Sequence, residues 1–281
     1  MLVKVMKANK INRGYITLVL LSIIWLFPIV SIVLTSFRGE QGFYSPNFIP
    51  KSFTFDNYIR LFTDTKVFYF GKWFLNTLFV AVASCILSTI CVLSISFVLS
   101  RIKFKQKKFM MNVFLILGMF PGFMSMIAVY FIIKALGLSQ SLLALIVVYS
   151  AGSGLGYYVV KGFFDTIPRD IDEAVMIDGG TKAQLFSRII IPLSKPIIIY
   201  TILTSFISPW CDYIFASVIL GDNYDSYTVA IGLFTMLENN YIDTWYTRFA
   251  AGAIIVALPI AVLFIKLRRF YVEGLSGSVK G

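Results

Sequence analysis

The sequence predicts an all-α integral membrane protein with six transmembrane helices. Hydrophobic residues make up 58% of its 281 positions, and the mean hydropathy of +0.82 lies outside the range of soluble globular domains. A helix needs about 20 mainly apolar residues to cross a hydrocarbon core roughly 30 Å thick. Six segments meet this requirement, and they cover residues 14–37, 73–100, 109–133, 142–160, 197–220 and 249–265.

The first segment, 14–37, follows a basic stretch that contains Lys4, Lys7, Lys10 and Arg13. This charge order resembles a signal peptide, whose apolar region has only about 7–15 residues and is followed by a small-residue cleavage site. Here the apolar run is longer and no such site follows it. We therefore expect the segment to remain as a span.

Charged or proline-containing stretches separate the other five segments. Residues 101–108 carry a basic cluster after the second span, and 161–196 hold a mixed-charge loop after the fourth. The sixth span, 249–265, is short and depends on its flanking residues for anchoring. Four prolines inside the spans predict kinks, because each removes a backbone hydrogen-bond donor, and they are Pro28, Pro121, Pro209 and Pro259.

The distribution of Lys and Arg predicts that both termini are cytoplasmic, because positive side chains are retained on that side during insertion. The N-terminal tail, residues 101–108, residues 161–196 and the end from 266 carry 18 of the 25 basic residues. The loop between spans four and five is therefore predicted to be cytoplasmic, and 221–248 external. Topology and attraction to membrane lipid account for the net charge of +11, so we expect no nucleic-acid partner.

The residue types of the chain argue against catalysis and metal binding. It contains no His, and its three Cys residues, which are Cys85, Cys91 and Cys211, are scattered through apolar runs without disulfide or metal-ligand spacing. A membrane enzyme would need a nucleophile with a base, or paired carboxylates in a span. A secondary transporter would need internal repeats with coupling-ion groups near the midplane. Neither pattern is recognisable, so we expect a non-catalytic subunit.

Asp212 is the only ionisable residue deep within a predicted span, between Trp210 and Tyr213. The helical rise from the start of span five places it roughly 23 Å from the cytoplasmic end, in the outer half of the membrane. The sequence is consistent with two roles for Asp212. In the first it lines a transport pathway together with Trp210 and Tyr213, and in the second its carboxylate pairs with another helix.

The cytoplasmic loop begins with a predicted short helix. Pro168 suits a first helical position, and Gly179 with Gly180 supplies an end signal. The first turn carries carboxylates, which offset the positive end of the helix dipole, and they are Asp170, Asp172 and Glu173.

A second short helix is predicted to follow directly. Thr181 and Gln184 have the Thr-x-x-Gln spacing of a capping box, and Pro192 and Pro196 are predicted to close the helix before span five.

The two loop helices differ in their apolar faces. The first has a narrow one at Ile171, Ala174 and Val175, flanked by Asp172 and Glu173. The second has a broader stripe that we expect to lie against the membrane bundle, made by Leu185, Phe186, Ile189 and Ile190. The loop is then a rigid elbow whose exposed helix enters a groove of a cytoplasmic partner. The alternative is a solvated surface loop.

The loop resembles the EAA loop of ATP-binding cassette (ABC) importer permeases. That motif reads Glu-Ala-Ala, three residues, Gly, nine residues, then Ile-x-Leu-Pro. Its spacing is matched throughout by residues Glu173, Ala174, Gly179, Ile189 and Pro192. Two positions depart from it but stay apolar, because Val175 replaces the second Ala and Ile191 replaces Leu.

The resemblance extends over nearly the whole chain, to the second permease subunit of maltose-type carbohydrate importers. It includes "NTLFVA" from Asn76, "FPGFMS" from Phe120, "FFDTIPRDIDEA" from Phe163 and the terminal "YVEGLSGSVKG". The stretches "SPWCDYIFASVIL" and "AIGLF" look most similar to maltodextrin permeases of Gram-positive bacteria.

The resemblance implies a coupling role for the first loop helix, in a cleft of a separate ATPase. The implied ATPase-coupling residues are Asp172, Glu173, Ala174, Asp178, Gly179 and Gly180. The implied ATPase-contacting residues of the tail are Gly274, Ser276, Gly277, Lys280 and Gly281. The external loop 221–248 would meet a sugar-loaded binding protein, and the membrane sugar site of this family lies mostly in the partner permease.

We expect no cofactor in this chain, because no Gly-x-x-x-x-Gly-Lys-Ser/Thr phosphate loop occurs in it. ATP and Mg would be bound by the partner ATPase. The resemblance implies a complex in the bacterial cytoplasmic membrane with a homologous second permease, two ABC subunits and an extracytoplasmic sugar-binding protein. The implied substrate is a carbohydrate, with malto-oligosaccharides first and another oligosaccharide, a polyol or glycerol phosphate as alternatives.

Overall fold

The computed structural model describes residues 2–45, 47–120, 122–151 and 154–277. These residues form helices joined by loops, and the only extended pairing among them is an isolated antiparallel bridge between Arg38 and Phe53. The predicted all-α class is confirmed.

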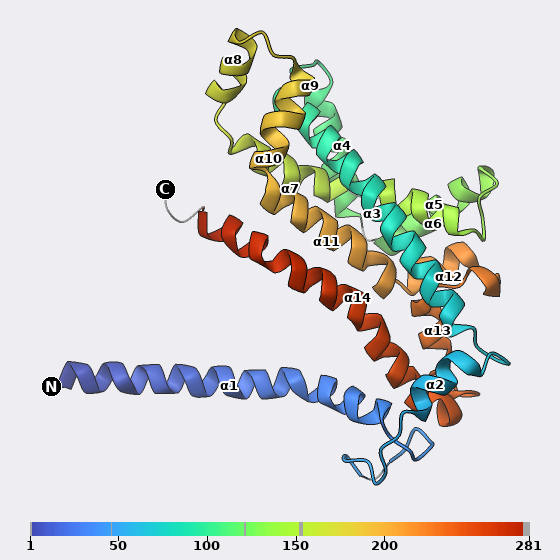
Figure 1. Ribbon diagram of the computed structural model, residues 1–281. Coiled ribbons are helices and arrows are strands. Elements are labelled where there is room, and N and C mark those ends of the chain that lie inside the picture. The colour runs from blue at the N-terminus through green and yellow to red at the C-terminus, as the bar shows by residue number, and fades with distance from the viewer. Residues whose placement is uncertain (1, 46, 121, 152–153, 278–281) are drawn as a thin grey trace. The chain divides into compact units, whose positions relative to one another are not determined.

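The chain divides into two compact units (Figure 1). Unit 1 consists of Met1–Phe70 and Leu233–Ala257, and unit 2 of Gly71–Gly232 and Leu258–Gly281. The prediction that residues 1–281 form one permease domain stays a prediction.

Unit 1 contains α1 (Leu2–Ser36), α2 (Asp56–Thr63) and the first part of α14 (Ile242–Gly277). The buried amide of Asn57 joins these three helices. It donates hydrogen bonds to the carbonyl oxygens of Ser36, at 3.0 Å, and Arg38, at 2.7 Å, and accepts one from the Thr247 hydroxyl at 2.9 Å. One polar side chain thus ties the end of α1 to the start of α14.

Most other helices belong to unit 2. In chain order they are α3 (Phe70–Arg101), α4 (Lys107–Met119), α5 (Gly122–Ala135), α6 (Leu142–Ala151), α7 (Gly154–Asp165), α8 (Asp170–Ile177), α9 (Lys182–Gln184), the π-helix η1 (Leu185–Ile190), α10 (Ile191–Leu193), α11 (Lys195–Cys211), α12 (Ile214–Leu220) and the 3₁₀-helix η2 (Tyr224–Ser226). The seven-residue α13 (Val229–Thr235) follows and leads into unit 1.

Six candidate spans are present if each bent helix pair counts as one span. Four are long apolar helices, at Gly14–Ser36, Phe70–Arg101, Leu142–Asp165 and Ile242–Arg268. The other two are bent pairs, Lys107–Met119 with Met124–Ala135 at 110° and Lys182–Leu193 with Lys195–Cys211 at 82°. The predicted number of six spans is confirmed by length and composition. Of the four prolines expected to kink spans, Pro121 lies outside the described residues.

Span five differs from the prediction of one helix over 197–220. Helix α11 ends at Cys211, Asp212 is extended with φ −88° and ψ 103°, and α12 starts at Ile214. The Asp212 carboxylate accepts a hydrogen bond from the Phe215 N–H at 3.0 Å. The continuous helix was a wrong prediction, because this carboxylate satisfies the first turn of a new helix.

Helix α3 is the central helix of unit 2, and small side chains line its buried face. Its fully or almost fully buried small residues are Thr77, Ala81, Ser84, Ser88, Ser96 and Ser100. Their spacing of three, four or eight residues keeps them on one side of the helix, where the hydroxyl groups among them can bond to neighbouring helices. The Ser96 hydroxyl donates to the Tyr157 carbonyl oxygen in α7 at 3.1 Å, and Ser205 in α11 donates to Ser88 at 3.2 Å.

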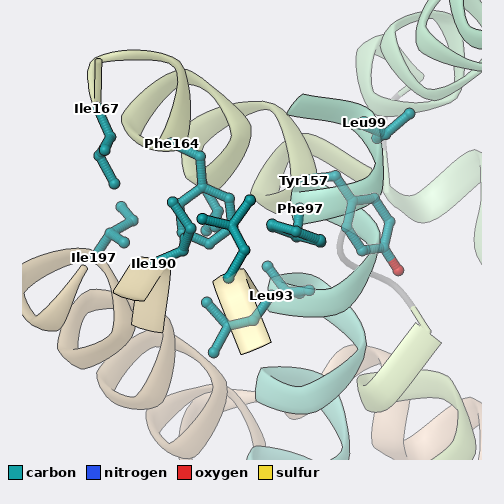
Figure 2. Close-up of a cluster of buried hydrophobic side chains, with 11 residues drawn as sticks. Leu93, Phe97, Leu99, Tyr157, Phe164, Ile167, Ile190 and Ile197 are labelled. Carbon is teal, nitrogen blue, oxygen red and sulfur yellow. The ribbon is translucent and has the colours of Figure 1, made fainter. Parts of the chain in front are cut away.

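A hydrophobic cluster fills the end of unit 2 where α3 finishes. Figure 2 shows Leu93 and Phe97 from α3 beside Tyr157 and Phe164 from α7, with side chains from η1 and α11 completing the cluster. Figure 1 shows α8 and α9 at this end of unit 2, and α12 and α13 at the other end of α3.

Gly232 in α13 lies at a position where a larger side chain would disturb the packing. A Cβ at Gly232 would overlap the ring of Trp73, which is fully buried and donates its indole N–H to the Tyr224 carbonyl oxygen at 3.2 Å. We expect Gly232→Ala to destabilise the protein by about 1–3 kcal/mol, as overpacking does.

The thermal midpoint of the purified, detergent-solubilised protein measures this effect. Gly162→Ala in α7 is the matched control, because no atom lies within 4 Å of a Cβ there and alanine favours the helix. Equal midpoints for the two variants would contradict the prediction.

Candidate coupling site and polar cavity

Helix α8 begins and ends close to the predicted residues. It starts at Asp170 after Arg169, so Pro168 lies just before it rather than in its first turn. At its end, Gly179 has a φ of +75° and donates to the Met176 carbonyl oxygen at 3.1 Å, while the Gly180 N–H reaches the Val175 carbonyl oxygen at 2.8 Å. These two bonds form a Schellman motif.

Steric constraints explain why both residues at this helix end are glycines. A left-handed φ at Gly179 disfavours any residue with a Cβ. A Cβ at Gly180 would lie 2.7 Å from Cγ1 and 2.9 Å from the carbonyl oxygen of Val175. The chain therefore leaves α8 in a fixed direction.

The second loop helix starts with the predicted capping box. The Thr181 N–H donates to Oε1 of Gln184 at 2.7 Å, and the Gln184 N–H donates to the Thr181 hydroxyl at 3.3 Å. Pro192 does not close the helix, because it lies inside α10, and the chain bends only at Ser194. The wide π turn of η1, just before Pro192, accommodates the missing N–H of the proline.

The elbow packs against the core of unit 2, as expected. Leu185 and Ile190 are buried in the cluster of Figure 2, with Phe186 and Ile189 packed against it. The rings of Phe97 and Phe186 have centroids 4.8 Å apart.

From α8, only part of the predicted narrow apolar face turns inward. Ile171 and Val175 pack against the cluster, whereas Ala174 is exposed.

A buried ion pair fastens the start of α8 to the end of α3. Nε of Arg101 lies 3.4 Å from Oδ2 of Asp172, and the two side chains are 3% and 18% exposed. Arg101 also donates to the Ile167 carbonyl oxygen at 2.9 Å, and Arg169 donates to the Ser100 carbonyl oxygen at 3.1 Å. The structure therefore turns Asp172, an implied coupling residue, inward toward Arg101.

The outer face of α8 carries the other implied coupling residues of that helix. Glu173 and Ala174 are exposed, and Asp178 is exposed just beyond the last turn. Two large apolar residues that are not among the implied coupling residues share this exposure. They are Met176, which is 41% exposed, and Ile177, which is 84% exposed. No periodicity in the sequence marks them, because their exposure results from Ile171 and Val175 taking the inner face.

The implied ATPase-contacting residues of the tail lie at the end of α14 or beyond it. Gly274, Ser276 and Gly277 fall within α14, and Lys280 and Gly281 lie outside the described residues.

A second feature of unit 2 is a cavity of about 830 Å³ between α3, α5, α6, α7, α11 and α12. Its walls are mostly apolar, and we call it the polar cavity because one stripe of the wall carries hydroxyl groups. One face of α11 lines it with hydroxyl groups at helical spacing, from Thr201, Thr204, Ser205 and Ser208. Ser125 from α5 and Tyr149 from α6 add two more. Sequence reasoning missed this face, because an α-helical hydroxyl stripe inside an apolar run resembles packing residues.

Asp212 lies at the helix break and lines this cavity. Its Oδ2 accepts a hydrogen bond from the Tyr149 hydroxyl at 2.8 Å. Asp212 thus lines a cavity and bonds to another helix, and its place in a transport pathway stays a prediction.

The two neighbours of Asp212 that were expected to line a pathway point elsewhere. Trp210 is buried, with its ring centroid 5.2 Å from that of Phe74, and Tyr213 packs against the second hydrophobic cluster of unit 2.

A family profile described as "Binding-protein-dependent transport system inner membrane component" matches residues 92–271. The chain belongs to this family, as a non-catalytic permease subunit of an ABC importer in the cytoplasmic membrane.

Individual relatives match almost over their full lengths. The galactooligosaccharides transport system permease protein GanQ of Bacillus subtilis is 34% identical over 99% of this chain and 98% of its own. The maltodextrin transport system permease protein MdxG of the same organism is 34% identical over 97% of each chain.

A solved structure shares the fold. It is the crystal structure of a bacterial ABC transporter involved in the import of the acidic polysaccharide alginate, with a TM-score of 0.78, 19% identity, and coverage of 92% of this chain and 95% of that one.

The buried ion pair generates a stability prediction. Asp172→Ala leaves the Arg101 guanidinium buried without its carboxylate, so we expect a loss of about 3–5 kcal/mol. In the double variant Arg101→Met/Asp172→Leu, neither charge is buried, and the thermal midpoint should return close to that of the unchanged protein. A double variant as unstable as Asp172→Ala would contradict the pairing.

Proposed function

We propose that this permease moves an oligosaccharide across the membrane and that α8 couples the movement to a separate ATPase. The observation that carries the proposal is the two-sided character of α8. Its inner face is held to the unit by Ile171, Val175 and the Arg101–Asp172 pair, while its outer face leaves Glu173 and Ile177 exposed. An anchored helix with an exposed apolar side chain is suited to entering a groove of another protein.

The exposed part of α8 indicates the chemistry of that groove. Ile177 needs an apolar recess to bury its side chain, and Glu173 needs a hydrogen-bond donor or a cation beside it. The same helix end borders a pocket of about 500 Å³, whose lining includes Glu173, Met176 and Ile177. A projecting side chain of the partner fits such a recess.

Movement of α8 has two routes into the membrane part of unit 2. The Arg101–Asp172 pair passes it to the end of α3, and the helix from α9 to α10 passes it to α11. Since α11 lines the polar cavity, we assign this cavity to the half of the pathway that this subunit provides.

The remaining partners are inferred from the family and from its named relatives. They are a homologous second permease, two ABC subunits that hold ATP and Mg, and an extracytoplasmic sugar-binding protein, with α8 and both termini in the cytoplasm. The names of the relatives support a galacto- or malto-oligosaccharide as substrate.

Substitutions that change the charge of the exposed face of α8 test the coupling role. We expect Glu173→Lys and Ile177→Asp each to reduce co-purification of the ATPase by about tenfold, which corresponds to about 1.4 kcal/mol of association free energy. Membrane insertion should be unchanged, because both side chains are exposed.

The matched control is Glu238→Lys, which makes the same charge change in the loop before α14, outside the elbow. Wild-type recovery of the ATPase with both α8 variants would exclude this helix as its docking element.

The tail generates a separate prediction. Deletion of residues 274–281 should lower the ATP hydrolysis that a sugar-loaded binding protein stimulates in the reconstituted complex, while the complex still assembles through α8. Full stimulation after the deletion would show that the tail has no part in coupling.

A further inference from the structure

The chemical character of the polar cavity in unit 2 suits a ligand rich in hydroxyl groups. Its α11 face offers hydroxyl oxygens that can accept hydrogen bonds, because the hydroxyl groups of Thr201, Thr204 and Ser205 already donate within the protein. Val92, Val129 and Val148 supply apolar surface. Tyr149, Tyr200 and Phe215 add aromatic rings to the lining, and these can cover the apolar C–H faces of a sugar ring. Apolar walls with a few placed polar groups are typical of small-molecule sites.

Asp212 is the only Asp, Glu, Lys or Arg among the described residues that line this cavity. Its two oxygens each accept one hydrogen bond, from the Tyr149 hydroxyl and the Phe215 N–H, and donate none. An ionised carboxylate accepts bonds of this kind. No cation in the lining offsets its charge.

The carboxylate is also held in place. It lies in the extended residue between α11 and α12 and caps the first turn of α12, so its position is set by two helices. A fixed charge in a cavity with mostly apolar walls is weakly screened, and its field acts on any charged group that enters.

From this geometry we propose that Asp212 makes the cavity selective for uncharged sugars and excludes acidic ones. The proposal rests on the assignment of the cavity to the transport pathway. It excludes sugar acids and sugar phosphates as substrates, and with them the glycerol phosphate alternative.

Thiol labelling tests the effect of the Asp212 charge on the cavity. The assembled complex is held in lipid nanodiscs, so that reagents reach both sides of the membrane. Cys85, Cys91 and Cys211 are first replaced by Ala, and Ser208→Cys then places one thiol in the cavity lining, one helical turn before Asp212. The measured quantity is the ratio of the labelling rates with a cationic and an anionic thiosulfonate reagent. We expect this ratio to be about tenfold higher for the cavity thiol than for a small thiol in solution.

Adding Asp212→Asn should remove most of this preference while keeping the cap of α12, because Asn is also a good N-cap residue. The control Asp225→Asn removes an exposed carboxylate that is not among the lining residues, and it should leave the preference unchanged. A preference that persists after Asp212→Asn would overturn the proposal, and so would a thiol that neither reagent modifies.

Sugar protection tests the selectivity itself. A neutral trisaccharide such as maltotriose, at half-saturation, should slow labelling of the thiol by uncharged N-ethylmaleimide about twofold. A trisaccharide of galacturonic acid at the same concentration should slow it only after Asp212→Asn. Equal protection by both sugars before that substitution would refute charge selection, whereas no protection by maltotriose would instead refute the assignment of the cavity to the pathway.

Discussion

The arrangement of unit 2 depends on hydrogen bonds between the small-residue face of α3 and other helices. Within a bilayer, apolar side chains gain nothing by leaving lipid for a neighbouring helix, so hydrogen bonds between helices contribute to their association. The buried serines of α3 provide such bonds, between Ser96 and α7 and between Ser88 and α11. Ser100 extends the series by donating to Asp165 at 2.6 Å, at the end of α7. Helices α7 and α11 lead into and out of the elbow, so their placement positions α8.

The same arrangement joins the elbow to the cavity. Helix α11 buries Ile199 and Leu203 on one side and presents its hydroxyl groups to the cavity on the other. Its first residue follows the bend after α10, and its last precedes Asp212. A displacement of the elbow therefore acts at one end of the helix whose other end carries the cavity's charge.

Unit 2 holds two half-buried carboxylates in different ways. Asp172 faces Arg101, and the pair fixes one helix to another at the cost of desolvating two charges. Asp212 has no cationic partner in the cavity lining and is stabilised by neutral donors, which leaves its charge available to a ligand. The first arrangement is suited to transmitting force and the second to selecting substrates.

Features with local signals could be predicted from the amino-acid sequence. Uncharged length predicts the spans, Gly179 and Gly180 end α8, and Thr181 with Gln184 caps the next helix, because each signal acts within a few neighbouring residues. The pairing of Arg101 with Asp172, the exposure of Ile177 and the break of span five at Asp212 became visible in the folded chain alone. These depend on contacts between helices far apart in the chain: Arg101 and Asp172 belong to α3 and α8, and Asp212 bonds to Tyr149 in α6. No pattern within one helix specifies which distant side chain faces it.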